Sequence, residues 1–228
     1  MVKMMKIQLS SFILKKGVSK KAGFILLTIF TSSSVLVEKK NTKPEAEWLS
    51  LFDGETLNGW HRFNRKGLEP FWKAENGTLS FEPSFPPEGD YVHDIVTDEE
   101  FTSFQLSIEW NIAEGGNSGI FWGVQEGGSH ERPYSTGPEI QVLDNERHPD
   151  AKANPKYHQA GALYDLVQPS KDVCKPAGEW NHILLTIDHN KNEGSVELNG
   201  TKIVEFPLKG ETWDTMVANS KFKDQCAF

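Results

Sequence analysis

The sequence predicts an all-β domain, either a sandwich, a jelly roll or a barrel, built from many short strands. Apolar and polar residues alternate with period two along residues 104–112 and again along 183–187, which is the pattern of strands with one buried face. Two further strand-like runs flank Asn199-Gly200, a dipeptide that supplies the positive φ angles of a type I′ hairpin turn. No long segment keeps a helical period, so strands and turns dominate the prediction.

Shorter runs of strand-forming residues fill the rest of the chain after residue 48. The two most prominent loops, 82–90 and 125–138, are rich in Gly and Pro, and long loops on a rigid sheet often carry function. No internal repeat has the spacing of a propeller or solenoid. The short strands are expected at 78–81, 95–97, 119–122 and 139–143.

The N-terminus has the pattern of a secretory signal peptide. Several lysines precede a short apolar run, 22–30, and small residues follow it. The apolar run is too short to span a membrane. Serines at 32–34 stand where a lipoprotein would need a Cys. We therefore expect an exported protein, periplasmic or secreted, the alternative being a disordered basic tail.

These features divide the chain into three parts. Residues 1–37 form the expected signal peptide, and the polar residues 38–47 predict a linker. Residues 48–228 are expected to form one domain, a size that suits an all-β fold. Cys174 and Cys226 are too few for a disulfide framework, and their spacing leaves open whether they pair.

Composition excludes one large class of partner. The chain of 228 residues has a net charge of −8 and a pI near 5.4, and no basic stripe follows residue 40, so a nucleic-acid partner is not expected. The aromatic content of 11%, with seven Trp, suits the binding of sugar rings and the core of a sandwich equally well.

Five segments, taken together and in order, resemble the 3-keto-disaccharide hydrolase family, which was formerly a domain of unknown function. The resemblance extends over nearly everything from residue 48 onward. The most characteristic motif is Thr136-Gly-Pro-Glu-Ile-Gln-Val-Leu-Asp-Asn145. The others are Leu51-Phe-Asp-Gly-Glu-Thr-Leu-Asn-Gly-Trp60, Gly116-Asn-Ser-Gly-Ile-Phe-Trp122, Ala160-Gly-Ala-Leu-Tyr-Asp165 and Gly178-Glu-Trp-Asn181.

The resemblance implies a fold and an activity. The fold is a concanavalin A-like jelly-roll sandwich of two antiparallel sheets, and the activity is hydrolysis of glycosides whose sugar is oxidised at C3. Family members usually continue with a Gly-x-Ile-x-Leu-Gln-Asp-His-Gly segment and a final strand, whereas this chain stops at Phe228. We therefore expect a domain that lacks its C-terminal strands, with a sheet edge exposed. The alternatives to a carbohydrate-cleaving enzyme are a non-catalytic carbohydrate-binding module and an inactive, truncated family member.

The strand expected at 139–143 carries the candidate catalytic groups. Side chains alternate along a strand, so Ile140 and Val142 would enter the core, and Glu139 and Gln141 would lie on the opposite, concave face. A bulge or strand end could turn Asp144 to the same side. Glu-x-Gln-x-x-Asp resembles, in spacing, the acidic strand of jelly-roll glucanases, where two carboxyl groups serve as acid and base. The alternative is polar residues on a solvated sheet face.

Oxidation at C3 sets the chemistry that the resemblance implies. A ketone at C3 acidifies the C2 proton, so a base can remove it, the C1 oxygen leaves by elimination, and water adds back. We assign the base to Glu139 and the acid to Asp144 or His158. Asn117, Gln141 and Tyr164 would donate hydrogen bonds to the substrate. Trp122 would stack on the sugar, the alternative being a place in the core.

No cofactor is expected. Asp144, His148, Asp150 and His158 lie close together in the sequence, but their spacing matches no zinc signature. A Ca²⁺ ion is conceivable in an exported sandwich and is not predicted. No Gly-x-Ser-x-Gly motif is present, which argues against a serine nucleophile.

Overall fold

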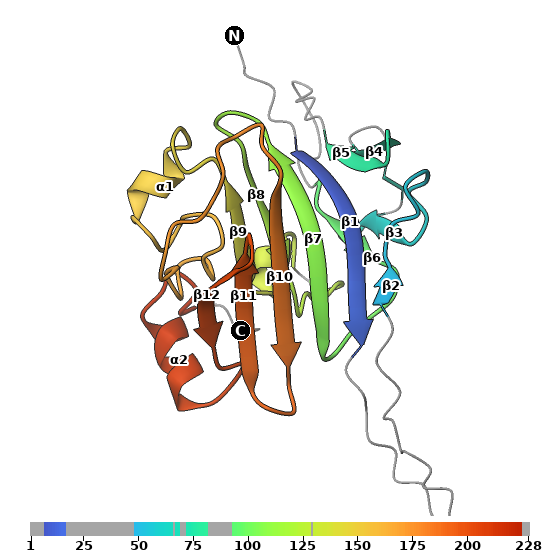
Figure 1. Ribbon diagram of the computed structural model, residues 1–228. Helices are drawn as coiled ribbons and strands as arrows, with labels where there is room; N and C mark the ends of the chain where they lie inside the picture. The colour runs from blue at the N-terminus through green and yellow to red at the C-terminus, as the bar shows by residue number, and fades with distance from the viewer. Residues whose placement is uncertain are drawn as a thin grey trace, which may run out of the picture.

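The computed structural model describes residues 7–16, 48–65, 67–68, 72–81, 93–128 and 130–224 (Figure 1). The expected linker, 38–47, and the Gly/Pro-rich loop at 82–90 lie outside these residues. The expected start of the domain, at residue 48, lies within them. The described elements are β1 (Ile7–Lys16), β2 (Trp48–Ser50), β3 (Trp60–Arg62), β4 (Trp72–Glu75), β5 (Thr78–Phe81), β6 (Ile95–Thr97), β7 (Phe104–Ile112), β8 (Asn117–Phe121), the 3₁₀ turn η1 (Pro133–Ser135), β9 (Glu139–Leu143), α1 (Asp150–Ala153), β10 (Asn181–Asp188), β11 (Glu193–Leu198), β12 (Thr201–Phe206) and α2 (Glu211–Ala218).

One large antiparallel sheet forms the front of the molecule. Its strand order is β12-β11-β10-β7-β1-β5-β4, and β2 also pairs with β1 (Figure 1). The alternating sequences at the centre of this sheet explain its amphipathic character. In β10, Ile183, Leu185 and Ile187 are almost completely buried, whereas the residues between them are partly exposed. The period-two predictions for β7 and β10 are therefore confirmed.

The hairpin between β11 and β12 is the one that the Asn-Gly dipeptide predicts. Asn199 has a φ of 50° and Gly200 a φ of 77°, so both central residues occupy the left-handed region that a type I′ turn requires. The Asn199 side chain also accepts the backbone N–H of His182 at 2.9 Å, which fixes this turn to β10. Local sequence thus determines the register of this end of the sheet.

A second layer lies behind the large sheet. It contains the antiparallel pairs β8–β9 and β3–β6, and Figure 1 shows β8 and β9 behind β10 and β11. Ile140 and Val142 of β9 are buried in one hydrophobic cluster with Leu185 of β10 and Val196 of β11. Two antiparallel layers with an apolar core between them make this a β-sandwich of the jelly-roll class, so the predicted fold class is confirmed.

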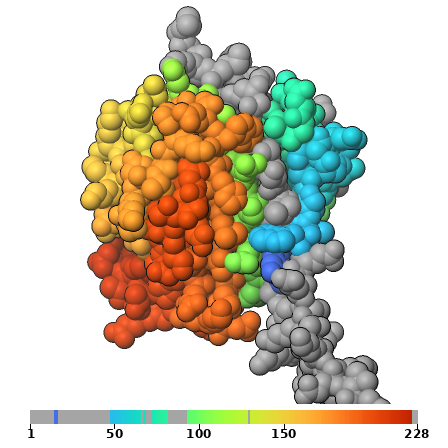
Figure 2. All heavy atoms as spheres, viewed as in Figure 1, coloured from blue at the N-terminus to red at the C-terminus, as the bar shows by residue number. Residues whose placement is uncertain are grey.

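Two features differ from the sequence prediction, one a helix and the other the bounds of a strand. The helix α2 follows the last strand and buries Trp213 against the core. The strand expected at 119–122 spans Asn117–Phe121 instead, which leaves Trp122 just beyond its end. Figure 2 shows β10–β12 and α2 (orange and red) over the centre and left of the front face, and the segments from β2 to β5 (cyan and teal) on its right. Within the described residues, no helix has the length and apolar character needed to cross a membrane.

The strand β1 bears on the expected signal peptide. Its backbone pairs with β7 along most of its length and with β5 and β2 on its other side. The apolar run at 22–30 lies outside the described residues. Cleavage after residue 37 would remove β1. Residues 7–16 can therefore either be cleaved off with a leader or remain as a strand of the sheet, but not both.

Candidate functional site

The strand pair β8–β9 divides its side chains between a core face and an outer face. Glu139 lies directly opposite Phe121, and Gln141 lies opposite Gly119. Residues that face each other across an antiparallel pair share one side of the sheet. Since Ile140 of β9 is in the core, Glu139 and Gln141 lie together on the outer face, as the alternation of the sequence predicts.

Gly119 makes room for the carboxyl group of Glu139. A Cβ atom added to Gly119 would lie 2.6 Å from both Cγ and Cδ of Glu139, which is closer than real Cβ contacts come. The glycine therefore allows the Glu139 side chain to lie flat over the neighbouring strand. Any larger residue at position 119 would displace the carboxyl group.

Burial gives Glu139 an unusual proton affinity. Desolvation of its carboxylate raises the pKa from 4.5 to about 8. The positive charge of Lys221 lowers the pKa and partly offsets this effect, while the negative charges of Asp94 and Asp150 raise it further. A carboxyl group that exchanges its proton near neutral pH can act as a general base or acid, and strongly shifted groups in cavities are often functional.

Two cavities meet at Glu139. The smaller has a volume of about 370 Å³ and the larger about 960 Å³. Asn117, Tyr134 and Glu139 line both, so these three residues mark the junction. The smaller cavity is further lined by Gln141, Asp150, Tyr164, Lys221 and Phe222. The structure thus brings four of the expected site residues together around the smaller cavity: Asn117, Glu139, Gln141 and Tyr164.

Tyr164 and His158 form a polar network beside the smaller cavity. The hydroxyl of Tyr164 donates a hydrogen bond of 2.9 Å to Asp150, and His158 Nδ1 lies 2.9 Å from the other oxygen of the same carboxylate. The second ring nitrogen of His158 lies 3.0 Å from Asp165, and the imidazole stacks on the Tyr164 ring at 4.3 Å. Burial and the Asp150 carboxylate together raise the pKa of Tyr164, which keeps its hydroxyl protonated.

His158 therefore does not reach the cavity as the catalytic acid that the sequence suggested. Both of its ring nitrogens face carboxylates, and it is absent from the residues that line the two cavities. Its contacts instead hold Asp150 and Tyr164 in place. The role that its geometry supports is that of a positioning residue.

Asp144 is also placed differently from the proposed acid. Burial by itself would raise its pKa, but backbone N–H groups of Gly115, Glu146 and Arg147, together with the Arg147 guanidinium, lower it. An ionised carboxylate that satisfies three backbone donors is suited to holding turns rather than to donating a proton. Asp144 lines neither cavity.

Trp122 packs in the core, the alternative that the sequence left open, and it also forms part of the wall of the larger cavity. Its ring is 9% exposed and stacks on Phe206 at 6.0 Å, with Trp213 at 6.2 Å. Trp122 lies on the same side as Ile120, whose partner Ile140 is in the core, and its ring packs against β12 and α2. The exposed aromatic ring at the junction of the cavities is that of Tyr134, in the loop at 125–138 that the sequence marked as functional.

Replacing Trp122 by Phe should lower stability without affecting sugar binding. The smaller ring leaves space between Phe206 and Trp213, so we expect the free energy of unfolding to fall by about 1–3 kcal/mol. Urea denaturation would measure this change, and KM for a sugar substrate should stay within about twofold of wild type. A tenfold rise in KM at unchanged stability would restore Trp122 to the binding site.

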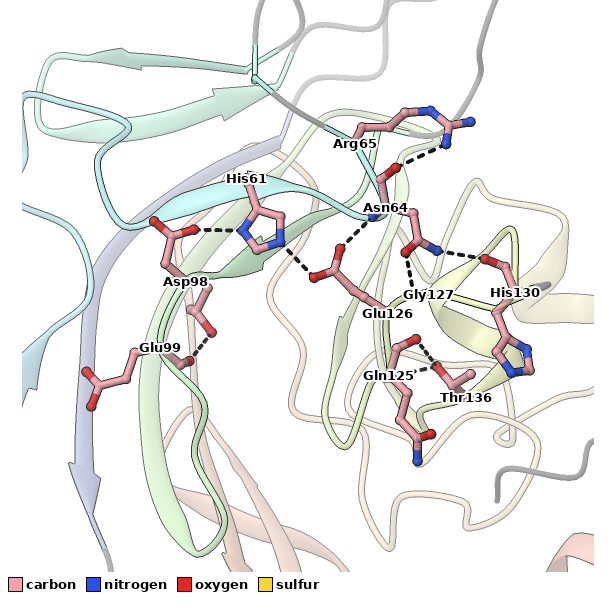
Figure 3. A network of polar contacts seen from close by, with 11 residues as sticks. His61, Asn64, Arg65, Asp98, Glu99, Gln125, Glu126, Gly127, His130 and Thr136 are labelled. Atoms are coloured by element: carbon pink, nitrogen blue, oxygen red, sulfur yellow. Dashed lines mark hydrogen bonds and ion pairs between the residues drawn. The ribbon is translucent and has the colours of Figure 1, made fainter.

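A second polar network fixes the 125–138 loop to the β3–β6 pair (Figure 3). His61 of β3 lies between two carboxylates, with Nδ1 2.7 Å from Asp98 and Nε2 2.8 Å from Glu126. Glu126 also accepts the Asn64 backbone N–H, and the Asn64 side chain binds the backbone at Gly127. The hydrogen bond to Glu126, supported by that to Asp98, raises the pKa of His61. The network holds the loop that carries Tyr134 against β3.

Two further residues near Glu139 were not predicted. Asp94, just before β6, lines the larger cavity, and desolvation raises the pKa of its carboxyl group. Lys221 follows α2 and lines the smaller cavity. Neither lies in a recognisable motif, and both are distant from residue 139 in sequence, so only the fold brings them to the site.

Two remaining features of the chain are possible metal ligands and the thiol of Cys174. Among the residues that the structure describes, no group of three or more His, Cys, Asp and Glu side chains is arranged to hold a metal ion. Burial raises the pKa of the Cys174 thiol to about 12. Cys226 lies outside the described residues.

Known proteins share this sequence and fold. A "3-keto-disaccharide hydrolase" from Bacteroides thetaiotaomicron is 33% identical over 192 residues, which is 77% of this chain. The chain spans 63% of that relative's length. A crystal structure from Parabacteroides distasonis ATCC 8503, of a protein provisionally assigned as a glycosyl hydrolase, superimposes with a TM-score of 0.68 at 28% identity, covering 78% of this chain and 80% of that one.

A second Parabacteroides distasonis structure with the same assignment has a TM-score of 0.50 at 24% identity, covers 71% of this chain and 66% of that one, and supports the fold alone. Residues 47–225 match the family described as the 3-keto-alpha-glucoside-1,2-lyase-like domain. This match extends over most of the chain and includes every residue that lines the two cavities. The chain therefore belongs to the family of 3-keto-alpha-glucoside-1,2-lyase-like domains.

Proposed function

We propose that this protein cleaves glycosides whose sugar carries a ketone at C3, by removing the C2 proton. The observation that carries the proposal is Glu139, a half-buried carboxyl group at the junction of two cavities, whose desolvation raises its pKa to about 8. A base of this strength suits a proton that is acidified by a neighbouring ketone. The family description and the name of the Bacteroides thetaiotaomicron relative support the same substrate class.

The reaction consists of an elimination, in which the C2 proton and then the C1 oxygen leave, followed by a hydration. Ionised Glu139 takes the C2 proton, and the electrons of the C2–H bond form an enolate with the C3 ketone. The enolate then collapses to a C1=C2 double bond, the C1–O bond breaks, and the leaving alcohol takes a proton. Addition of water across C1=C2, with the proton returned to C2, completes a net hydrolysis.

The two cavities suggest how such a substrate would lie. The smaller cavity, lined by Asn117, Gln141 and Tyr164, suits the oxidised sugar ring, since all three side chains carry hydrogen-bonding groups. Tyr134, exposed at the junction, offers a ring face for stacking. The leaving group would then extend into the larger cavity, past Glu139.

Asp94 is the acid in this proposal, in place of Asp144 or His158. It lines the larger cavity, where the leaving oxygen would lie, and its raised pKa favours a protonated carboxyl group. Glu139 and Asp94 line the same cavity, and an ionised Asp94 would raise the pKa of Glu139 further, so the two carboxyl groups are coupled. Two carboxyl groups in one cavity can divide the roles of base and acid.

A comparison of substrates tests the proposal. The protein should cleave a 3-keto-glucoside and exchange its C2 hydrogen with D₂O, and it should leave the unoxidised glucoside intact. Mass spectrometry of the sugar and of the released alcohol measures both results. Cleavage of the unoxidised glucoside at a similar rate, or cleavage of the 3-keto-glucoside in D₂O without incorporation of deuterium at C2, would contradict the elimination mechanism.

The acid has its own test. Asp94→Asn should slow release of methanol from a methyl 3-keto-glucoside by about 10²-fold or more, because alkoxide is a poor leaving group. Release of p-nitrophenol should slow far less, since p-nitrophenolate leaves without a proton. Equal effects on both substrates would remove Asp94 from this role.

Export is a separate proposal. The lysines before the apolar run at 22–30 and the small residues after it support a secretory leader. A periplasmic or secreted enzyme would meet its carbohydrate substrate outside the cytoplasm.

A further inference from the structure

Lys221 is held at the smaller cavity by several independent contacts. Lys221 lies in the turn that follows α2, and its backbone N–H donates a hydrogen bond of 2.8 Å to the Asp165 carboxylate. Its ammonium lies 3.9 Å from the centre of the Tyr164 ring and 5.1 Å from that of Phe222. The Tyr164 ring is itself fixed, since its hydroxyl binds Asp150 and His158 stacks on its face. Lys221 is exposed, like Lys223, and these ring contacts place its ammonium group beside the cavity.

The charge of Lys221 is distinct from that of every other residue around this cavity. Among the described residues that line it, Lys221 is the one cation, whereas Glu139 and Asp150 are acids. The charge of Lys221 also acts on Glu139 and favours its ionised form. A single ammonium in an otherwise acidic and partly enclosed cavity is well placed to meet a developing negative charge.

The proposed reaction develops such a charge at one atom. When the C2–H bond breaks, its electrons move to the C3 oxygen, and no residue of the site has yet been assigned to that oxygen. The neutral donors Asn117 and Tyr164 line the same cavity, but the Tyr164 hydroxyl already donates to Asp150. An ammonium group offers three donors and a full charge, which makes it the stronger partner for an enolate.

We propose that Lys221 is a further catalytic residue, whose ammonium group binds the C3 oxygen of the 3-keto sugar and stabilises the enolate. This inference rests on the proposed function, because it assigns the electrophile for the same proton transfer. The C2 proton goes to Glu139, the electron pair goes to the C3 oxygen, and Lys221 keeps all of its protons while it hydrogen-bonds that oxygen.

The test compares Lys221→Met with Lys221→Arg and a matched control, Lys223→Met. Lys223 is an exposed lysine of the same turn and lines neither cavity. We expect Lys221→Met to lower kcat on a 3-keto-glucoside by about 10²–10³-fold, the effect of removing one oxyanion donor, with KM changed by less than about threefold. Lys221→Arg keeps the charge and should retain at least about a tenth of kcat, and Lys223→Met should match wild type.

The pH profile separates this role from a structural one. Loss of the cation raises the pKa of Glu139, so the rising limb of kcat/KM should move to higher pH in Lys221→Met and stay in place in Lys221→Arg and Lys223→Met. If the Met variant lacks a cooperative melting transition, the Arg variant decides: a loss of kcat equal to that of Glu139→Gln would overturn the inference.

Failure of the inference can be told apart from failure of the proposed function. A wild-type protein that cleaves the 3-keto-glucoside, with a folded Lys221→Met variant of equal kcat, would overturn the role of Lys221 and leave Glu139 as base. A wild-type protein that neither cleaves the 3-keto-glucoside nor exchanges its C2 hydrogen would overturn both.

Discussion

Glu139→Gln should lower the rate of cleavage of a 3-keto-glucoside by at least about 10³-fold, because the amide cannot accept the C2 proton. Gln is nearly isosteric with Glu and fits the space over Gly119, so the fold should persist. Loss of C2-hydrogen exchange in D₂O, measured by NMR, would show that proton removal itself has stopped. A variant with unchanged turnover would exclude Glu139 as the base.

The same substitution should raise stability at alkaline pH. The folded-state pKa of Glu139 is about 8 against an ordinary 4.5, so the unfolded chain loses this proton first. The folded state is therefore penalised as the pH rises from about 4.5 to about 8, and the penalty is then complete. Glu139→Gln removes the ionisable group, and we expect a gain of about 4 kcal/mol in the free energy of unfolding at pH 8 and almost none at pH 4.

Urea denaturation at several pH values measures this difference. A wild-type protein whose stability relative to Glu139→Gln does not change between pH 4 and pH 8 would mean that the carboxyl group is solvated. A variant that is inactive and yet more stable than wild type would show that the site is kept at a cost to the fold, as is common for functional groups that must be buried.

Gly119→Ala should lower activity by about 10²-fold although position 119 carries no chemistry. The new Cβ would come within 2.6 Å of Glu139 Cγ and Cδ, closer than real Cβ contacts, so the carboxyl group has to shift. A displacement of about 1 Å from the reacting geometry can cost 10²-fold in rate. Steady-state kinetics on a 3-keto-glucoside would measure the loss, mainly in kcat.

A shorter acid provides the control for this effect. In the double variant Gly119→Ala, Glu139→Asp, the missing methylene makes room for the alanine. The fold-loss of activity in the double variant should therefore be smaller than the product of the fold-losses of the two single variants. On the Glu139→Gln background, Gly119→Ala should change nothing further, since there is no carboxylate left to displace. Strictly additive effects in both comparisons would show that Gly119 acts by some route other than Glu139.

The sequence was a good guide to the strands and to the face on which the site lies. Alternation in β7 and β10 and the Asn199-Gly200 turn are local patterns, and the structure follows them directly. The placement of Glu139 and Gln141 on one face required only the period of a strand. The same period, counted from Ile120, puts Trp122 on the core side, so its packing follows the strand pattern rather than the stacking role.

The rest of the site depends on contacts between distant parts of the chain. Asp94 and Lys221 are 45 and 82 residues from Glu139, and no pattern around them indicates that they share cavities with it. His158 was named as an acid because it is close in sequence, yet its two ring nitrogens are occupied by Asp150 and Asp165. Residue type and spacing identify candidates, whereas tertiary packing decides whether a side chain faces the cavity or another side chain.

The strand β1 gives the first residues of the chain a decisive part in assembly. It lies between β7 and β5, so a form cut after residue 37 would leave both neighbouring strands with unpaired N–H and C=O groups in the interior of the sheet. Such an open slot accepts an extended segment by strand addition, from another copy or from an unrelated chain. In a chain that keeps residues 7–16, strand β1 fills this slot itself.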